Sequence, residues 1–201
     1  GMTRAGTYPL SDVARIQIYL STTKNTKSGM ANILKKTGGT LVLNGPIFLR
    51  TMKPCCHLKA DGEVKCAPAY TAWGLSWNEP ADFCVERVAS DKANYAECVH
   101  IIVGRKKISP INCGADMRYA CNRVAIGVKD GRFAYYATED NLTPEELRDV
   151  LFSAGWSDAI MMDGGGSACC LDKYGNGFAG DGRYVPFWLV VTLKDKDNEP
   201  E

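Results

Sequence analysis

The feature that most constrains the fold is a pair of Asp-Gly dipeptides, each flanked by residues that favour β-strands. Asp61-Gly62 and Asp130-Gly131 each separate two such runs. Asp-Gly is typical of two-residue hairpin turns because both residues tolerate positive φ. The flanking runs predicted as strands are His57–Ala60, Glu63–Cys66, Val124–Lys129 and Arg132–Thr138. The sequence therefore predicts sheets in which neighbouring strands pair as antiparallel hairpins.

Other short apolar runs predict further strands, and the hydrophobic period predicts two helices. The further predicted strands are Arg15–Ser21, Thr40–Leu43, Gly74–Trp77, Phe83–Val88, Glu97–Val103, Ala159–Met162 and Trp188–Lys194. Met30–Lys36 is predicted as a short helix that Gly38-Gly39 stops, after a polar loop over Thr22–Ser28. The last segment, Asp195–Glu201, is predicted as a charged tail.

The clearest helix signal lies in the segment Leu142–Gly155. Thr143–Glu146 reads Thr-Pro-Glu-Glu, which has the form of a capping box with proline at the first helical position. Apolar residues then follow with the spacing of one buried helix face, and Gly155 suits a C-terminal stop. These apolar residues are Leu147, Val150, Leu151 and Ala154.

Length and composition indicate one globular domain over residues 1–201. The chain has 45% hydrophobic and 23% charged residues, which is ordinary for a globular protein. We predict an α+β fold with mixed or antiparallel sheets built from hairpins, and a few helices packed against them. The net charge of +1 argues against a nucleic-acid binder held by overall charge. No stretch is long and apolar enough for a membrane span.

Nine cysteines stand out, because an odd number cannot all pair within one chain. Met2–Tyr8 lacks the apolar core of a secretory signal, so we expect reduced thiols in the cytoplasm. Release by a route without a signal is compatible with this expectation. No cysteine pair has the Cys-x(2–4)-Cys spacing of structural zinc sites, so no metal site is predicted. A cysteine nucleophile at Cys55-Cys56-His57 is a weaker alternative.

The segment Asp163-Gly164-Gly165-Gly166-Ser167 carries the strongest functional signal. It directly follows the predicted buried strand Ala159–Met162. Three successive glycines let peptide N–H groups converge on one point, and such a concave nest binds anions, phosphate above all. Ser167 adds a hydroxyl donor, and Asp163 stands where a strand ends, a usual place for a functional side chain. A plain glycine turn between two strands is the alternative.

Several motifs resemble those of the phosphodiester glycosidases, in the order in which that family has them. Ile160–Ser167 resembles the glycine-rich signature, and Leu43–Phe48 resembles an Asn-Gly-Gly-Phe-Phe motif. Arg123–Gly127 resembles an Arg-Thr-Ala-Ile-Gly strand, and Arg183–Pro186 resembles the segment before the last strand. The resemblance covers about residues 40–193. Compact members occur in bacteria and bacteriophages, so the resemblance implies a bacterial or phage source.

The sequence also departs from the family pattern at several positions. Pro46 and Ile47 replace Gly and Phe, Val124 replaces Thr, and Cys169-Cys170 replace small polar residues. These departures affect the identity of the substrate more than the fold. The resemblance implies a hydrolase that cleaves a sugar-1-phosphodiester of the N-acetylglucosamine type. We predict no cofactor.

The resemblance assigns catalytic roles to Asp163, Arg123 and Asn44. The leaving group is a phosphate monoester, so donors that stabilise its charge matter more than a strong general acid. Arg123 can bind phosphate bidentately, and Asn44 can bind the sugar or the phosphate. Asp163 can act as nucleophile, as base for water, or as anchor for a sugar hydroxyl. The remaining predicted substrate contacts are Gly45, Gly164, Gly165, Gly166, Ser167, Arg183 and His57.

Three further hypotheses remain open. Asp163 together with Asp140 or Asp172 can hold a divalent cation such as calcium. The chain can also be a carbohydrate- or phosphate-binding module of a phage or cell-envelope system that has lost catalysis, and Pro46 and Ile47 favour that alternative. A structural protein with a coincidental glycine turn is a third possibility. The oligomeric state cannot be predicted from these residues.

Overall fold

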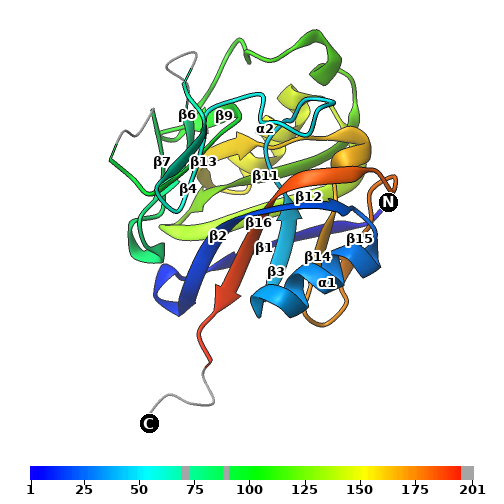
Figure 1. The fold of residues 1–201 in the computed structure, drawn as a ribbon. Helices are drawn as coiled ribbons and strands as arrows, with labels where there is room; N and C mark the ends of the chain where they lie inside the picture. Colours follow the sequence, from blue (N-terminus) through cyan, green and yellow to red (C-terminus); the bar gives the residue numbers. More distant parts are fainter. Residues whose placement is uncertain (69–72, 88–90, 196–201) are drawn as a thin grey trace.

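A computed structural model describes residues 1–68, 73–87 and 91–195. Within these residues the chain forms three sheets, all of whose strand pairs are antiparallel, and two α-helices (Figure 1). The first sheet, in spatial order, consists of β1 (Thr3–Tyr8), β12 (Arg132–Leu142), β11 (Cys121–Lys129), β13 (Trp156–Met161), β9 (Val99–Val103) and β10 (Lys106–Lys107). The α+β prediction is thereby confirmed.

The other two sheets have five strands each. The second contains β15 (Gly177–Phe178), β14 (Cys170–Asp172), β3 (Leu41–Asn44), β16 (Tyr184–Leu193) and β2 (Val13–Lys24). The third contains β5 (Glu63–Cys66), β4 (Leu58–Ala60), β8 (Asn94–Glu97), β6 (Trp73–Trp77) and β7 (Cys84–Arg87). Short 3-10 helices are η1 (Leu10–Asp12), η2 (Pro80–Asp82), η3 (Ala115–Met117) and η4 (Gly165–Ser167).

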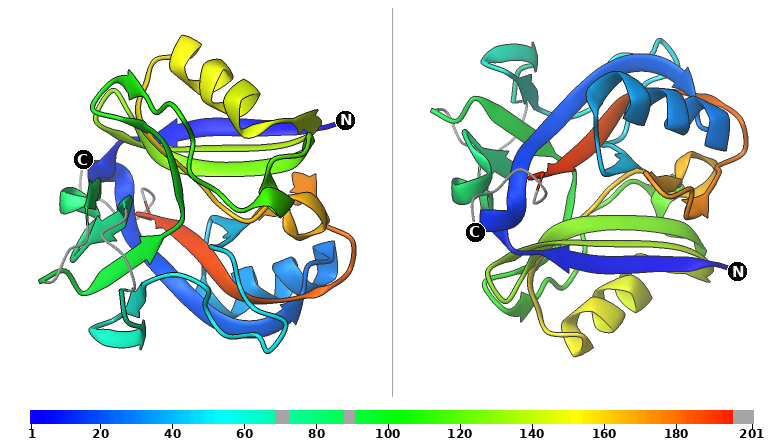
Figure 2. Two further views of the ribbon diagram at one scale, coloured as in Figure 1. Left: turned by 90° about the horizontal axis from the view of Figure 1, so that it is seen from above. Right: turned by 90° about the horizontal axis from the view of Figure 1, so that it is seen from below.

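The first and second sheets lie face to face, and each carries one helix on its outer side (Figure 2). The main core fills the space between them, with Val124 and Ile126 from β11 and Leu43 and Leu189 from the second sheet. A smaller cluster, which includes Met30, lies between the second sheet and α1 (Lys27–Thr37). The outer helix on the first sheet is α2 (Pro144–Ser153).

Both predicted Asp-Gly hairpins are confirmed. β4 pairs with β5 across Asp61-Gly62, and β11 pairs with β12 across Asp130-Gly131. All four turn residues have positive φ, between 48° and 85°, as the tight hairpin turn requires. The local sequence therefore determines these two connections.

The capping box of α2 is also confirmed, but its buried face is narrower than predicted. The Thr143 hydroxyl accepts from the Glu146 N–H at 3.2 Å, and Glu146 Oε1 accepts from the Thr143 N–H at 2.9 Å. Leu147 and Leu151 are buried, whereas Val150 is 40% exposed. The helix lies on an outer face of the molecule, so only a narrow stripe contacts the sheet.

Two boundaries differ from the predictions. The expected loop Thr22–Ser28 is short, because β2 runs to Lys24 and α1 already begins at Lys27, with Thr26 as its N-cap. The predicted strand Glu97–Val103 is divided at Cys98, where the chain passes from the third sheet into the first. The last position of the predicted strand Phe83–Val88 lies outside the described residues, and so do positions 196–201 of the predicted tail Asp195–Glu201.

Gly127 sets the spacing between β11 and β13, the strand that leads to the glycine-rich segment. A Cβ added at Gly127 would come within 2.0 Å of the Asp158 carbonyl oxygen on β13. We expect Gly127→Ala to lower the free energy of unfolding by roughly 1–3 kcal/mol, because the strands must separate. The measurement is urea unfolding. Gly131→Asn is the matched control, since its added side chain meets open space and asparagine tolerates positive φ; an equal loss in both variants would contradict this explanation.

Candidate active site around the glycine turn

The predicted site segment leaves the first sheet after β13 and enters the second sheet at β14. Asp163 and Gly164 precede η4, and a hydrogen bond from the Ser167 N–H to the Gly164 carbonyl closes the turn at 3.2 Å. We call residues 163–167 the glycine turn. Gly165 has φ +61°, which glycine adopts without strain. In the described part of the chain, no acceptor contacts the N–H groups of Gly165 and Gly166. Two peptide donors are therefore available to a ligand.

Asp163 is largely buried at the start of this turn. Its Oδ1 accepts from the Gly164 N–H at 3.0 Å, and the Ser167 side chain also hydrogen-bonds to it. Burial raises the pKa of Asp163 above its ordinary value. The Ser167 and Gly164 hydrogen bonds and the charge of Arg183 oppose that rise, while Asp116 adds to it. Asp116 lies on η3, and the sequence analysis did not identify it.

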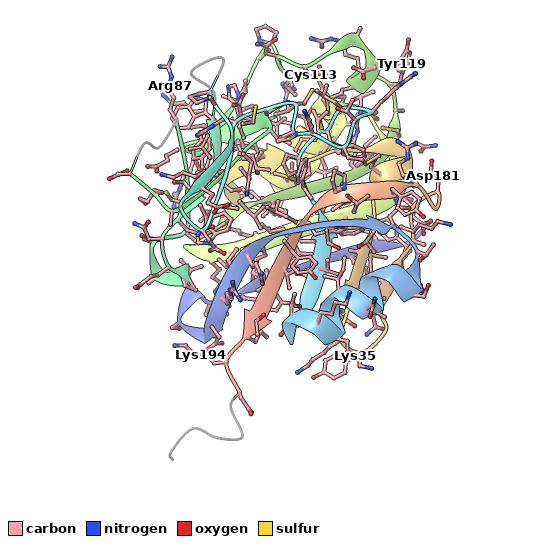
Figure 3. The ribbon with its side chains drawn as sticks, viewed as in Figure 1. Lys35, Arg87, Cys113, Tyr119, Asp181 and Lys194 are labelled. Carbon is pink, nitrogen blue, oxygen red and sulfur yellow. The ribbon has the colours of Figure 1, made fainter. Side chains whose placement is uncertain are left out.

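Arg183 reaches the turn through Ser167. Its Nη1 lies 3.4 Å from the Ser167 hydroxyl, and its Nη2 donates to Asp181 Oδ2 at 2.7 Å. Asp181 lies in the loop that precedes β16 (Figure 3). Gly166 has to be glycine here, because a Cβ would come within 2.3 Å of both side chains of this ion pair. The structure thus brings the predicted residues Asp163, Ser167 and Arg183 together.

The Asn44 side chain hydrogen-bonds to the backbone of the glycine turn and of the residues that follow it. Its Nδ2 donates to the Asp163 carbonyl at 2.8 Å, and its Oδ1 accepts from the Cys169 N–H at 3.2 Å. The side chain is completely buried. Gly45, next in the chain, accepts from the Asp163 N–H and donates to the Phe187 carbonyl at 2.9 Å. A direct contact of Asn44 or Gly45 with substrate stays a prediction.

Arg123 is fully buried and most of its donors are engaged. Nε donates to the Leu142 carbonyl at 2.8 Å, and Nη2 donates to the carbonyls of Met117 and Tyr119 at 2.8 and 2.6 Å. Its Nη1 faces the glycine turn, 3.2 Å from where a Cβ on Gly164 would lie. No carboxylate in the described ranges forms an ion pair with Arg123. A buried cation without an acidic partner favours an anion nearby.

Asn25 is a residue of the site that the sequence analysis missed. Its Nδ2 donates to the Gly166 carbonyl at 2.8 Å, and its Oδ1 accepts from the Gly182 N–H at 2.9 Å. It is fully buried and ties the glycine turn to the loop that carries Asp181 and Arg183. The only local signal was its place in a polar run between two predicted elements, which does not identify a partner so distant in sequence.

His57 lies just before β4 of the third sheet instead of at the glycine turn. It is buried, its Nδ1 lies 2.6 Å from the Cys66 carbonyl, and its ring packs 5.0 Å from that of Tyr95. Its backbone N–H donates to Glu97 Oε2 at 3.0 Å. None of these contacts joins it to the described residues of the turn. A role of His57 in substrate binding has no geometric support here.

The acidic residues considered for a cation are engaged elsewhere. Asp140 lies 3.4 Å from the N-terminal amine, and Asp172 Oδ1 accepts from the N–H groups of Tyr174 and Asn176. Among the described residues, no group of three or more His, Cys, Asp or Glu side chains is placed to hold a metal ion. The cysteines are free thiols, and burial raises the pKa of Cys170 to about 11 and that of Cys56 to about 12. Neither thiol is an activated nucleophile.

A cavity of about 370 Å³ lies beside the glycine turn. Its lining residues are Cys121, Asn122, Glu139, Asn141, Gly165, Gly166, Ala179, Gly180 and Asp181. A larger depression of about 630 Å³ lies between β2, residues 49–54 and β16, and its lining includes Leu20, Leu49 and Phe187. That depression is mainly apolar and contains none of the predicted site residues. The polar cavity is the one that the turn borders.

Comparisons with known proteins agree with the sequence resemblance. A model of the phosphodiester glycosidase family matches residues 57–192, which includes Arg123, the glycine turn and Arg183 but not Asn44. No curated protein sequence matches the chain. No helix in the described ranges is both long and apolar enough to cross a membrane.

Two solved structures share the fold at low sequence identity. A hypothetical protein from Synechocystis has a TM-score of 0.77 at 9% identity, over 96% of this chain and 59% of that one. The zebrafish N-acetylglucosamine-1-phosphodiester alpha-N-acetylglucosaminidase catalytic domain, auto-inhibited by its pro-peptide, has a TM-score of 0.70 at 11% identity. That match covers 96% of this chain and 83% of the zebrafish domain. This chain therefore spans about three fifths of the Synechocystis protein.

Removing the Asn44 amide should destabilise the protein. Asn44→Ala leaves the Asp163 carbonyl and the Cys169 N–H without their partner, and we expect a loss of about 1–3 kcal/mol in the free energy of unfolding. Urea unfolding measures this loss. Asn32→Ala, at an exposed position on α1, is the control and should change stability by no more than about 0.5 kcal/mol. An unchanged urea midpoint for Asn44→Ala would rule out this role.

Proposed function

Because the chain belongs to the phosphodiester glycosidase family, we propose that it hydrolyses the bond between a sugar and a phosphodiester at its anomeric carbon. The observation that carries the proposal is Asp163, a largely buried carboxylate with a raised pKa at the start of a turn with two free peptide donors. The name of the zebrafish relative makes N-acetylglucosamine the first sugar to test. No cofactor is part of the proposal.

The glycine turn would hold the phosphate of the substrate. The N–H groups of Gly165 and Gly166 are without acceptors in the described structure, and peptide donors in a tight turn suit an anion. Arg123 adds a buried positive charge next to Gly164. Its Nη1 is the part nearest the turn, so it would act as one donor and as a fixed charge rather than as a bidentate clamp.

The reaction exchanges one C–O bond for another. The bond from the anomeric carbon to the phosphate oxygen breaks, and its electron pair stays on the phosphate monoester that leaves. Water supplies the new oxygen on carbon and loses one proton. Charge therefore accumulates on the departing phosphate as an oxocarbenium-like centre forms on the sugar, and donors fixed at the phosphate stabilise that state.

Asp163 would act in its ionised form. It either attacks the anomeric carbon or takes the proton from the attacking water, and both roles need the carboxylate. A hydroxyl anchor is the third role for the same ionised group. Ser167 and the charge of Arg183 keep the pKa of Asp163 from rising further, so they maintain the reactive form. Arg183 is thus a positioning residue in this mechanism.

The decisive variant is Asp163→Asn, tested on a chromogenic N-acetylglucosamine phosphodiester. We expect kcat to fall by roughly a hundredfold or more, because the amide cannot act as nucleophile or base. Asp130→Asn, in the exposed turn between β11 and β12, is the isosteric control and should retain full activity. Wild-type turnover in Asp163→Asn would contradict the mechanism. If the unmutated protein binds the phosphodiester but releases no product, the result would instead support the binding module.

The pH dependence follows from the direction of the pKa shift. Because Asp163 must be ionised and its pKa is raised, kcat/KM should rise with pH through an acidic limb above the ordinary Asp value of about 4. Arg183→Ala removes a positive charge that lowers this pKa, so the limb should move to higher pH. Arg132 is an exposed arginine next to the turn between β11 and β12, so Arg132→Ala should leave the pH profile unchanged. A limb that stays fixed in Arg183→Ala would exclude the positioning role.

A further inference from the structure

We propose that the cavity beside the glycine turn is a subsite for one neutral sugar ring. Asn122 and Asn141 would hydrogen-bond to the sugar hydroxyl groups, and Glu139 would disfavour a sugar that carries a carboxylate. The inference rests on the proposed function, because it places the sugar of that substrate on the cavity side of the turn. Asn122 precedes Arg123 on β11, and Glu139 and Asn141 lie on the paired strand β12. All three are new to the site.

The two asparagines are available to a ligand. In contrast to Asn25 and Asn44, neither side chain hydrogen-bonds to any described residue, although both line the cavity. A side-chain amide offers both a donor and an acceptor, and a sugar hydroxyl can use either. Gly165 and Gly166, whose N–H groups have no acceptor among the described residues, border the same cavity. A ligand placed there lies close both to the two asparagines and to the glycine turn.

The two carboxylates of the lining differ in their charge balance. Arg183 neutralises Asp181 at 2.7 Å, whereas Glu139 Oε1 accepts a backbone N–H from Met2 at 3.2 Å and has no ion pair among the described residues. Glu139 can accept a hydrogen bond from a sugar hydroxyl, but it repels a carboxylate on the sugar. The cavity therefore favours a neutral sugar over a uronic acid.

The size of the cavity limits the occupant. Its volume of about 370 Å³ lies near the lower end of ordinary ligand pockets. Such a space suits a single sugar ring with its phosphate at the turn, rather than a longer glycan. The mixture of carboxylate, amide and peptide N–H groups also matches a ligand that carries both hydroxyls and an anion, whereas inorganic phosphate uses only the donors.

The test measures binding by calorimetry, with N-acetylglucosamine 1-phosphate, glucuronic acid 1-phosphate and inorganic phosphate as probes. None of these is a phosphodiester, so binding is measured without turnover. We expect Asn122→Ala and Asn141→Ala each to weaken N-acetylglucosamine 1-phosphate about tenfold and to leave inorganic phosphate unchanged. Asn32→Ala is the matched control on α1 and should bind all three probes as the wild type does.

Glu139→Gln tests the selectivity separately. The wild type should prefer the neutral sugar phosphate, and the variant should bind glucuronic acid 1-phosphate more tightly, which narrows the ratio of the two Kd values. The subsite is overturned if the wild type binds no sugar phosphate, or if the asparagine variants bind it normally. It is also overturned if those variants weaken sugar phosphate and inorganic phosphate equally. Sugar-selective binding without phosphodiester hydrolysis would uphold the subsite and reject the proposed enzyme. Hydrolysis by the wild type, together with normal sugar-phosphate binding by the two asparagine variants, would support the enzyme and reject the subsite.

Discussion

The site depends on hydrogen bonds from three buried side chains to the backbone of irregular segments. Asn44 and Asn25 contact the two ends of the glycine turn, and Arg123 donates to the carbonyls of Leu142, Met117 and Tyr119. The buried peptide groups of an irregular segment cannot all form the regular hydrogen bonds of a helix or a sheet. Each group left unpaired lowers the free energy of unfolding by on the order of 1–3 kcal/mol. These contacts therefore determine where Asp163 and the free N–H groups lie.

The parts of the fold that could be predicted are those whose cause is local. Asp130-Gly131 predicts a hairpin because both residues tolerate positive φ, and the structure has both at positive φ. Thr143 and Glu146 predict the start of α2 because their side chains satisfy each other's backbone N–H groups. In both cases the interacting atoms lie within a few residues. A single sequence contains all the information needed for such predictions.

The parts that could not be predicted depend on partners far along the chain. Cys98 divides a continuous apolar run, because the residues before and after it pair in different sheets. Asn25 is 141 residues from its partner Gly166, and nothing around it indicates that contact. Arg123 was identified from its motif, yet its available donor depends on where the carbonyls of Met117 and Tyr119 fall. Motifs thus locate the site, while tertiary contacts decide which atoms remain free for a ligand.

The charges around the turn suggest why Asp163 needs support. A phosphodiester bound at Gly165 and Gly166 would bring a negative charge close to a carboxylate whose pKa burial already raises. Like charges would raise that pKa further and favour the unreactive protonated form. Arg123, near Gly164, offsets the charge of the phosphate, and the charge of Arg183, near Gly166, lowers the pKa of Asp163. In the proposed reaction, the charges of two arginines thus allow the phosphodiester to be bound while the Asp163 carboxylate stays ionised.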